Sequence, residues 1–285
     1  MENLPAENVQ TENKSYPRIK NAILLCLLLL GFQTGAGIFF GTIIGIFRIG
    51  TDSLIYGVGL IVLSILSFGA VIFIGFKKTN KKFNDVFLFN NISPGLWISV
   101  IVFMFGFVII SSELDNFVNF LLPMPEFLQE IFDSLLINDF FIVSIILVGI
   151  MPAFLEEMLF RGLFLSGFKD NYSKTKAIFI SALLFGLIHL NPYQFVTAFI
   201  IGIVTAWLYL ELKSIWPCIY MHLFNNLLAV FVMNFKDVFN IEGFNSYTER
   251  AFQPLWFNAV GLGLTVTGVL LFFFFLEKAK AKSAL

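Results

Sequence analysis

Long apolar runs are the feature that most limits what this chain can fold into. Of its 285 residues, 58% are hydrophobic and only 13% are charged, whereas about a quarter of the residues of a soluble domain are charged. A helix needs roughly 20 apolar residues to cross the hydrocarbon core of a bilayer. The sequence therefore predicts an all-α fold, a polytopic membrane bundle of about eight transmembrane helices, at residues 21–47, 54–76, 95–112, 139–168, 174–190, 193–211, 214–235 and 255–276.

Lysine and arginine residues are unevenly distributed over the connecting segments. With eight spans, fourteen of the 18 Lys and Arg residues fall on one side of the membrane, and only Arg48, Lys236 and Arg250 fall on the other. Cytoplasmic segments carry such an excess of positive charge. We therefore expect an integral, multi-pass protein of the cell (plasma) membrane with both termini in the cytoplasm.

Composition divides the chain into three parts. The polar residues 1–16 predict a flexible N-terminal tail, residues 17–277 form a single transmembrane domain, and residues 278–285 form a short basic C-terminal tail. The first apolar run is too long for a cleavable signal peptide and no A-x-A-like site follows it. We therefore expect this run to remain as a membrane span.

Two local patterns predict how parts of the bundle pack. Glycines recur at G-x-x-x-G spacing between Gly31 and Gly45, which favours close packing of the first helix inside the bundle. In the outer loop 113–138, apolar residues recur at helical spacing and predict a short amphipathic helix on the membrane surface. They are Phe127, Leu128, Ile131, Phe132, Leu135 and Leu136.

Several classes of function find no support in the sequence. It has no P-loop, no G-x-G-x-x-G, no H-E-x-x-H and no basic patch of the kind that binds nucleic acid. Cys26 and Cys218 lie inside apolar runs, which is typical of packing residues rather than of a disulfide. We therefore expect no nucleic-acid partner, and the lipid bilayer is the first partner that the sequence implies.

Charged residues inside a predicted span mark the candidate site. The stretch 150–163 reads I-M-P-A-F-L-E-E-M-L-F-R-G-L, and charge in such a setting is normally kept only if it is paired or used. Glu157 and Arg161 are four residues apart on one helix face and can form an ion pair. Glu156 points about 100° away from Glu157 and is left free, unless both glutamates bind Arg161 to hold the bundle together.

The only two histidines of the chain, His189 and His222, also fall inside predicted spans, and Asn226 lies one helical turn after His222. Glu156 and His189 are each 13 residues from the cytoplasmic loop that joins their spans. His222 and Asn226 are 9 and 13 residues beyond the cytoplasmic turn at Lys213. The helical rise places all four about 14–20 Å from these turns. Four polar groups at one depth on three helices predict a single site.

Such a site has the groups for hydrolysis by an activated water. No Ser or Cys lies beside a base at this depth, so covalent catalysis is not expected. A carboxylate and an imidazole can hold and deprotonate a water, and a second imidazole and an amide can stabilise an oxyanion. Glu156, His189 and His222 could equally offer zinc a carboxylate and two imidazoles, with one coordination position left open.

Three motifs in order resemble those of the CPBP family of intramembrane proteases, also called the CAAX prenyl endopeptidase and bacteriocin-processing (Abi) family. The family pattern is E-E-x-x-x-R, then F-x-x-x-H, then H-x-x-x-N. The resemblance covers roughly residues 150–230, inside a protease core at about 139–235. The chain carries the motifs as Glu156-Glu157-x-x-x-Arg161, Phe185-x-x-x-His189 and His222-x-x-x-Asn226.

The resemblance implies an intramembrane endopeptidase of the glutamic type. The water would be activated by Glu156 and His189, and the oxyanion would be bound by His222 and Asn226. Supporting roles would belong to Glu157 and Arg161. No cofactor is preferred, and a zinc-dependent protease with the same residues is the alternative. The substrate would be a peptide or protein, either prenylated or bacteriocin-like.

Two further classes of function stay open. A membrane immunity factor or scaffold could keep this fold without catalysis. A proton-coupled transporter could use Glu156 and His189 as a relay, although the sequence lacks the inverted pair of broken helices that is typical of transporters. The oligomeric state is left open by the sequence.

Overall fold

The computed structural model describes residues 15–137, 140–238, 240–245 and 251–283. Within them, extended pairing is limited to one bridge between Phe89 and Ser214, so the predicted all-α class is confirmed. Most of the predicted N-terminal tail, residues 1–14, lies outside the described residues. The elements are α1 (Ile19–Phe47), α2 (Leu54–Lys77), α3 (Phe83–Val86), α4 (Pro94–Leu121), α5 (Glu126–Leu136), α6 (Phe141–Ser144), the π-helix η1 (Ile145–Ile150), α7 (Met151–Glu157), the π-helix η2 (Met158–Phe164), α8 (Leu165–Asn171), α9 (Lys174–Leu187), α10 (Pro192–Leu212), α11 (Trp216–Asn234) and α12 (Leu255–Ser283).

Polar caps and prolines determine where several helices begin. The side chains of Ser53, Ser173 and Asn191 each accept the backbone N–H three residues ahead. This satisfies a donor that the first turn of a helix leaves unpaired. Prolines lie in the first turn of α4, α10 and α11, where a missing N–H breaks no helical bond. The starts of these helices are therefore encoded locally.

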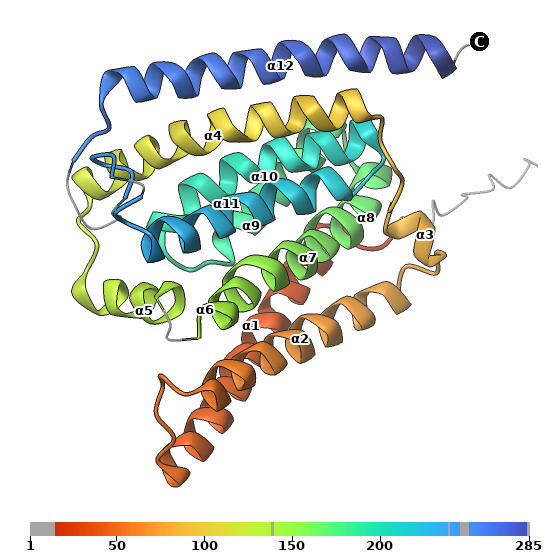
Figure 1. Cartoon of the computed structure of the whole chain (residues 1–285). Coiled ribbons are helices and arrows are strands. Elements are labelled where there is room, and N and C mark those ends of the chain that lie inside the picture. The colour runs from red at the N-terminus through yellow and green to blue at the C-terminus, as the bar shows by residue number, and fades with distance from the viewer. Residues whose placement is uncertain (1–14, 138–139, 239, 246–250, 284–285) are drawn as a thin grey trace, which may run out of the picture.

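Most of the long helices lie side by side in one bundle (Figure 1). α12 packs along α4, α10 packs along α9, and α11 contacts both η1 and α7. The elements α6 to α8 form one continuous helical run from Phe141 to Asn171, which crosses the bundle beside α11 (Figure 1). α1 and α2 form a hairpin whose connecting turn projects away from the other helices (Figure 1).

Seven helices among the described residues are long and apolar enough to cross a membrane, close to the predicted count of about eight. The predicted span that falls short is 174–190, because α9 has only 14 residues and is about 21 Å long, less than the hydrocarbon core of about 30 Å. α9 nevertheless runs antiparallel to α10, and Lys174 at its start forms an ion pair with Glu211 near the end of α10. The protein is thus a polytopic membrane bundle with one short member.

Two predicted boundaries differ from the structure. Residues 113–121 were assigned to the outer loop but continue α4 to Leu121. They can do so because Glu113 has partners, the backbone N–H of Gln253 and the Asn258 amide, at the start of α12. α12 runs on to Ser283, so residues 278–283 are helical rather than a tail. The amphipathic helix predicted in the outer loop is confirmed as α5.

The glycines of α1 do not pack inside the bundle, so that prediction was wrong. A Cβ atom added at any of them would meet no atom within 4 Å; they are Gly31, Gly35, Gly37, Gly41 and Gly45. Close packing occurs between α4 and α12 instead. There, a Cβ at Gly106 would lie 2.3 Å from the backbone nitrogen of Thr265, and one at Gly268 would lie 2.4 Å from Cα of Phe103.

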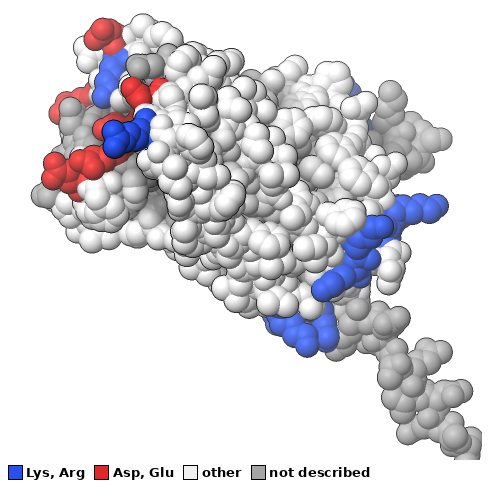
Figure 2. Space-filling view, turned by 90° about the horizontal axis from the view of Figure 1, so that it is seen from below, with Lys and Arg blue, Asp and Glu red and all other residues white. Residues whose placement is uncertain are grey.

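Charges gather at the two ends of the molecule, with apolar surface between them (Figure 2). One end, called here the acid-rich end, holds α5 and the segment after α11, with Glu126, Glu130, Asp133, Asp237 and Glu242. The other, called here the lysine-rich end, holds the end of α2 and the start of α9, with Lys77, Lys78, Lys81, Lys82, Lys174 and Lys176. The apolar surface between the ends is the part that hydrocarbon would cover.

Replacing Gly106 by Ala should destabilise the bundle by about 1–3 kcal/mol, because overpacking against backbone atoms forces two helices apart. The added methyl group would lie 2.5 Å from the carbonyl oxygen of Gly261 as well as against Thr265. Gly263→Ala on the partner helix α12 is the matched control, since no atom lies within 4 Å of its Cβ position. Thermal unfolding in detergent measures both, and equal midpoints for the two variants would contradict the packing.

Candidate functional site

The site is centred on a helix whose winding changes twice. α7 is flanked by the π-helices η1 and η2, in which the backbone bonds i→i+5 and the turn is wider than in an α-helix. Such π segments are frequent at functional sites. Glu156 and Glu157 are the last two residues of α7, so they lie where the wider winding of η2 begins.

Glu157 holds two partners inside the bundle. Its side chain is 1% exposed, and its Oε2 lies 3.1 Å from Nε of Arg161, whose side chain is 0% exposed. Its other oxygen, Oε1, lies 3.0 Å from Nδ1 of His222 on α11. Because a carboxylate only accepts, Nδ1 of His222 carries a proton and donates it. The ion pair predicted between Glu157 and Arg161 is confirmed, and Glu157 also orients His222.

Arg161 is compensated by more than its carboxylate. Nε and Oε2 are close enough for an ion pair, but their alignment is not that of a hydrogen bond. Nη2 of Arg161 donates to the carbonyl of Gly202 on α10 at 3.4 Å, and the guanidinium lies 4.2 Å from the ring centroid of Phe185. A cation over an aromatic face gains most where water is excluded. Arg161 thus connects η2 with α9 and α10.

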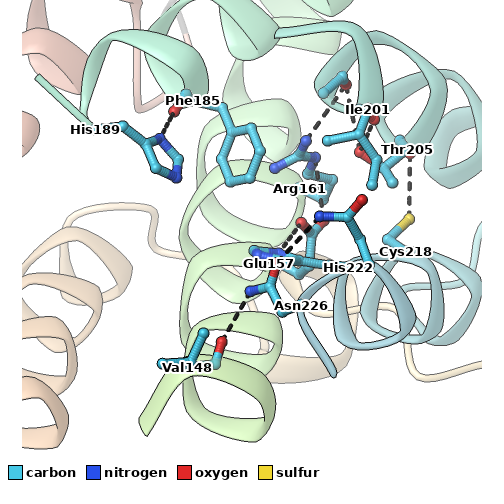
Figure 3. Close-up of polar contacts among 12 residues, drawn as sticks. Val148, Glu157, Arg161, Phe185, His189, Ile201, Thr205, Cys218, His222 and Asn226 are labelled. Atoms are coloured by element: carbon cyan, nitrogen blue, oxygen red, sulfur yellow. Dashed lines mark hydrogen bonds and ion pairs between the residues drawn. The ribbon is translucent and has the colours of Figure 1, made fainter. Parts of the chain in front are cut away.

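Phe185 separates the two histidines (Figure 3). Its ring meets the rings of His189 and His222 edge to face, with centroids 5.4 Å apart in both pairs. Its backbone carbonyl also accepts from Nδ1 of His189 at 2.9 Å. Since a carbonyl can only accept, a neutral His189 carries its proton on Nδ1 and leaves Nε2 as an acceptor. His189 is therefore held in the form that a base requires.

His189 lies in the turn between α9 and α10. Leu190 has a left-handed backbone with φ of 56°, which is unfavourable for a bulky side chain. Asn191 stabilises this turn, because its amide donates to the His189 carbonyl at 3.0 Å while its oxygen caps α10 at Gln194. Irregular backbone at membrane depth is tolerated where it lines a cavity, and both His189 and Asn191 do so.

Asn226 is fixed by the backbone carbonyl of Val148. Val148 lies in η1, in the turn before Pro152, and Pro152 has no N–H to donate to that turn. The Asn226 amide donates to this carbonyl at 2.9 Å (Figure 3). An asparagine amide has a second N–H, so Asn226 keeps one donor for another acceptor. Asn225 donates to the Asn226 oxygen at 3.3 Å.

Glu156 is the carboxylate without a partner. Its Oε2 is buried and makes no hydrogen bond within the described structure, whereas the neighbouring Glu157 contacts both Arg161 and His222. Glu156 also lines the main cavity of the molecule. The sequence-based expectation that the helix face separates the two glutamates agrees with these contacts.

The cavity brings the four proposed catalytic residues together. It has a volume of about 670 Å³, and Glu156, His189, His222 and Asn226 all line it. From this site it extends only toward the acid-rich end, along Val108 to Asn119 of α4, Leu147 to Glu156, and His222 to Met233 of α11. α5 covers its outer part with Leu128, Ile131, Phe132, Leu135 and Leu136.

The opposite side of the cavity is closed by the buried charge cluster. Glu157, Arg161 and Phe185 are each at most 1% exposed, and they occupy the interior just beyond Glu156 and His222. The cavity therefore extends toward the acid-rich end, and the packed cluster closes it toward the lysine-rich end.

The three residues of the zinc alternative line one cavity. Among the described residues, no three or more His, Cys, Asp and Glu side chains are grouped closely enough to hold a metal ion. Glu156, His189 and His222 share a cavity without forming such a group. Nδ1 of each histidine is engaged by Phe185 or Glu157, so Nε2 is the atom that each could turn toward a water or a ligand.

Sequence reasoning missed several contacts of this site. It assigned Glu157 only to Arg161 and did not find its bond to His222. It also missed the position of the Phe185 ring between the histidines, although F-x-x-x-H spacing places the Phe185 carbonyl one turn before His189. The contact between Asn226 and Val148 had one indication in the sequence. Pro152 has no backbone N–H, so a carbonyl of the preceding turn is left without that donor.

Comparison with known proteins identifies one family. The sequence model described as type II CAAX prenyl endopeptidase, Rce1-like, matches residues 138–228. This segment contains all the residues of the three motifs, and the match confirms their resemblance to the CPBP family. It supports a peptidase, in a chain whose long apolar helices make it an integral membrane protein. No curated protein and no solved structure matches the chain.

Two adjacent substitutions should separate the roles of the glutamates. Glu157→Gln removes the carboxylate that is paired with the buried Arg161 charge and should cost about 3–5 kcal/mol of stability. Glu156→Gln removes a charge that has no partner, so its unfolding midpoint should equal or exceed that of the wild type. Thermal unfolding in detergent compares them, and a larger loss in Glu156→Gln would contradict this division.

Proposed function

We propose that this protein is an intramembrane endopeptidase in which a water activated by Glu156 and His189 hydrolyses a peptide bond. One observation carries the proposal: a buried carboxylate oxygen without a hydrogen-bond partner lines the same cavity as a histidine whose Nδ1 is already engaged. The match to a peptidase family over residues 138–228 supports it.

The first step would be proton transfer from water to this pair. A water that donates to Glu156 Oε2 and to Nε2 of His189 would have its oxygen free for attack on a substrate carbonyl. The Glu156 carboxylate would take one proton from the attacking water and later give it to the leaving amine, as general acid–base catalysis requires. Because the site is walled by apolar helices, little other water competes with the substrate.

The second pair would stabilise the oxyanion that forms on the substrate. The free N–H of the Asn226 amide is a donor fixed in place by its bond to Val148. His222 would donate from Nε2 when its ring is protonated, a state in which the Glu157 carboxylate already accepts at Nδ1. Donors that are fixed before reaction act strongly in a site that excludes water.

The direction of the cavity suggests where the substrate comes from. Lysine and arginine mark cytoplasmic segments, so the lysine-rich end and both termini are assigned to the cytoplasm of a cell membrane. The cavity extends toward the opposite end. The substrate would then be a peptide or protein segment, prenylated or bacteriocin-like, that reaches the site from the non-cytoplasmic face.

Removing the activating groups should abolish cleavage while the protein still folds. Glu156→Gln and His189→Ala should lower kcat by about 10²–10⁴-fold, and Asn226→Ala should lower it by about 10²–10³-fold. Release of a quenched fluorescent peptide in proteoliposomes measures this, with Glu130→Gln on the exposed face of α5 as the control. Full activity in Glu156→Gln would contradict the role given to Glu156, whereas no cleavage by the wild type would favour the relay or scaffold alternatives.

Chelation separates the glutamic from the zinc mechanism. If water is activated by Glu156 and His189 alone, cleavage should be unchanged after the purified protein is treated with a zinc chelator. Elemental analysis of the same sample measures its bound zinc. Activity that is lost on chelation and restored by added zinc would overturn the glutamic assignment and leave the proposed peptidase activity intact.

A further inference from the structure

A second carboxylate, Asp115 on α4, lines the proposed catalytic cavity. It is half-buried, and its Oδ1 accepts from the hydroxyl of Thr197 on α10. Neither the three motifs nor the proposed mechanism uses it. Asp115 and Glu156 are the two acidic residues among the described residues that line this cavity, and no Lys or Arg lines it.

Three other polar side chains on this part of α4, those of Glu113, Asn116 and Asn119, have structural partners. Asn116 donates to Glu113 and to the carbonyl of Gly243, and Asn119 accepts the backbone N–H of Met124. Glu113 also accepts from the start of α12. These contacts tie α4 to the segments at the acid-rich end. Asp115 differs from them because its bond to a neutral hydroxyl leaves its charge uncompensated.

An uncompensated carboxylate in such a place is unfavourable unless a cation approaches it. The surroundings favour that approach, because acidic residues gather at the end from which the cavity is reached (Figure 2). A cleft of one sign of charge between low-dielectric walls concentrates ions of the opposite sign. The hydrogen bond from the Thr197 hydroxyl does not by itself require a charged residue at position 115, since an asparagine oxygen would accept the same hydroxyl.

We propose that Asp115 is a specificity-determining residue that pairs with a positively charged side chain of the peptide substrate. The proposal rests on the proposed function and names a substrate class for it: peptides with a lysine or arginine near the cleaved bond. Asp115 lies seven residues, or about 10 Å along the helix axis, beyond Val108 at the inner limit of the cavity. An extended peptide advances about 3.3 Å per residue. The cationic residue of the substrate would therefore lie roughly three residues away from the substrate residue that is deepest in the cavity.

Binding to an inactive protein tests this without requiring catalysis. The probes are eight-residue Ala/Leu peptides, capped at both ends and fluorescently labelled, with one Lys or one Gln at each position in turn. In full-length Glu156→Gln protein in nanodiscs, the Lys peptide should bind about tenfold more tightly than its Gln counterpart, and only within a window of a few positions. Adding Asp115→Asn should remove the preference.

Two matched controls separate the charge from its surroundings. Glu126→Gln removes one negative charge that is exposed at the same end and does not line the cavity, and it should keep the preference. Thr197→Val removes the hydroxyl tie but keeps the Asp115 charge, and it should keep the preference as well. Loss of the preference in either control would overturn the assignment to Asp115.

The outcomes also distinguish this proposal from the proposed function. Equal binding of the Lys and Gln peptides, a preference that is the same at every position, or one that survives Asp115→Asn would each overturn the role of Asp115. If Asp115→Asn does not fold, the position scan and Asp115→Glu, which should keep the preference, decide the question. If the wild-type protein binds the Lys peptides preferentially but does not cleave them, the result contradicts the proposed peptidase activity. The role of Asp115 in binding a cationic residue would then still hold.

Discussion

The contact on which the structure most depends is the buried pairing of Glu157 with Arg161 and His222. Hydrocarbon provides no water to solvate a charge, so each of these groups must find its partner within the protein. Glu157 uses one oxygen for the arginine on its own helix and the other for the histidine on α11. Arg161 adds the Gly202 carbonyl and the Phe185 ring. One cluster therefore fixes the mutual positions of η2, α9, α10 and α11.

The same cluster gives the cavity its direction. Because the charged groups and Phe185 pack without exposure, they close the interior toward the lysine-rich end. The polar groups that remain beside them, Glu156, His189 and Asn226, face a cavity that extends the other way. The site thus lies on the acid-rich side of the cluster, where the surface charge is mostly negative.

Departures from regular helix are concentrated around this cavity. The cavity is lined by residues of the π-helix η1, by Pro152, and by His189 and Asn191 on either side of the left-handed Leu190. The second π-helix, η2, begins two residues after Glu156. Each of these departures would be unfavourable in contact with lipid, because backbone groups there must be paired within the protein. Here the Asn226 amide pairs with the Val148 carbonyl and the Asn191 amide with the His189 carbonyl, and His189 and Asn226 both line the cavity.

The sequence by itself determined the membrane class, most helix positions, the Glu157–Arg161 pair and the seven motif residues, because apolar length, spacing and helical rise are local properties. Tertiary structure decided the rest. Three features depend on which helices meet. His222 bonds to the second oxygen of Glu157, Gly106 and Gly268 pack closely while the glycines of α1 do not, and Asp115 lines the same cavity as Glu156. No spacing along one helix contains that information, since these contacts join residues far apart in the chain.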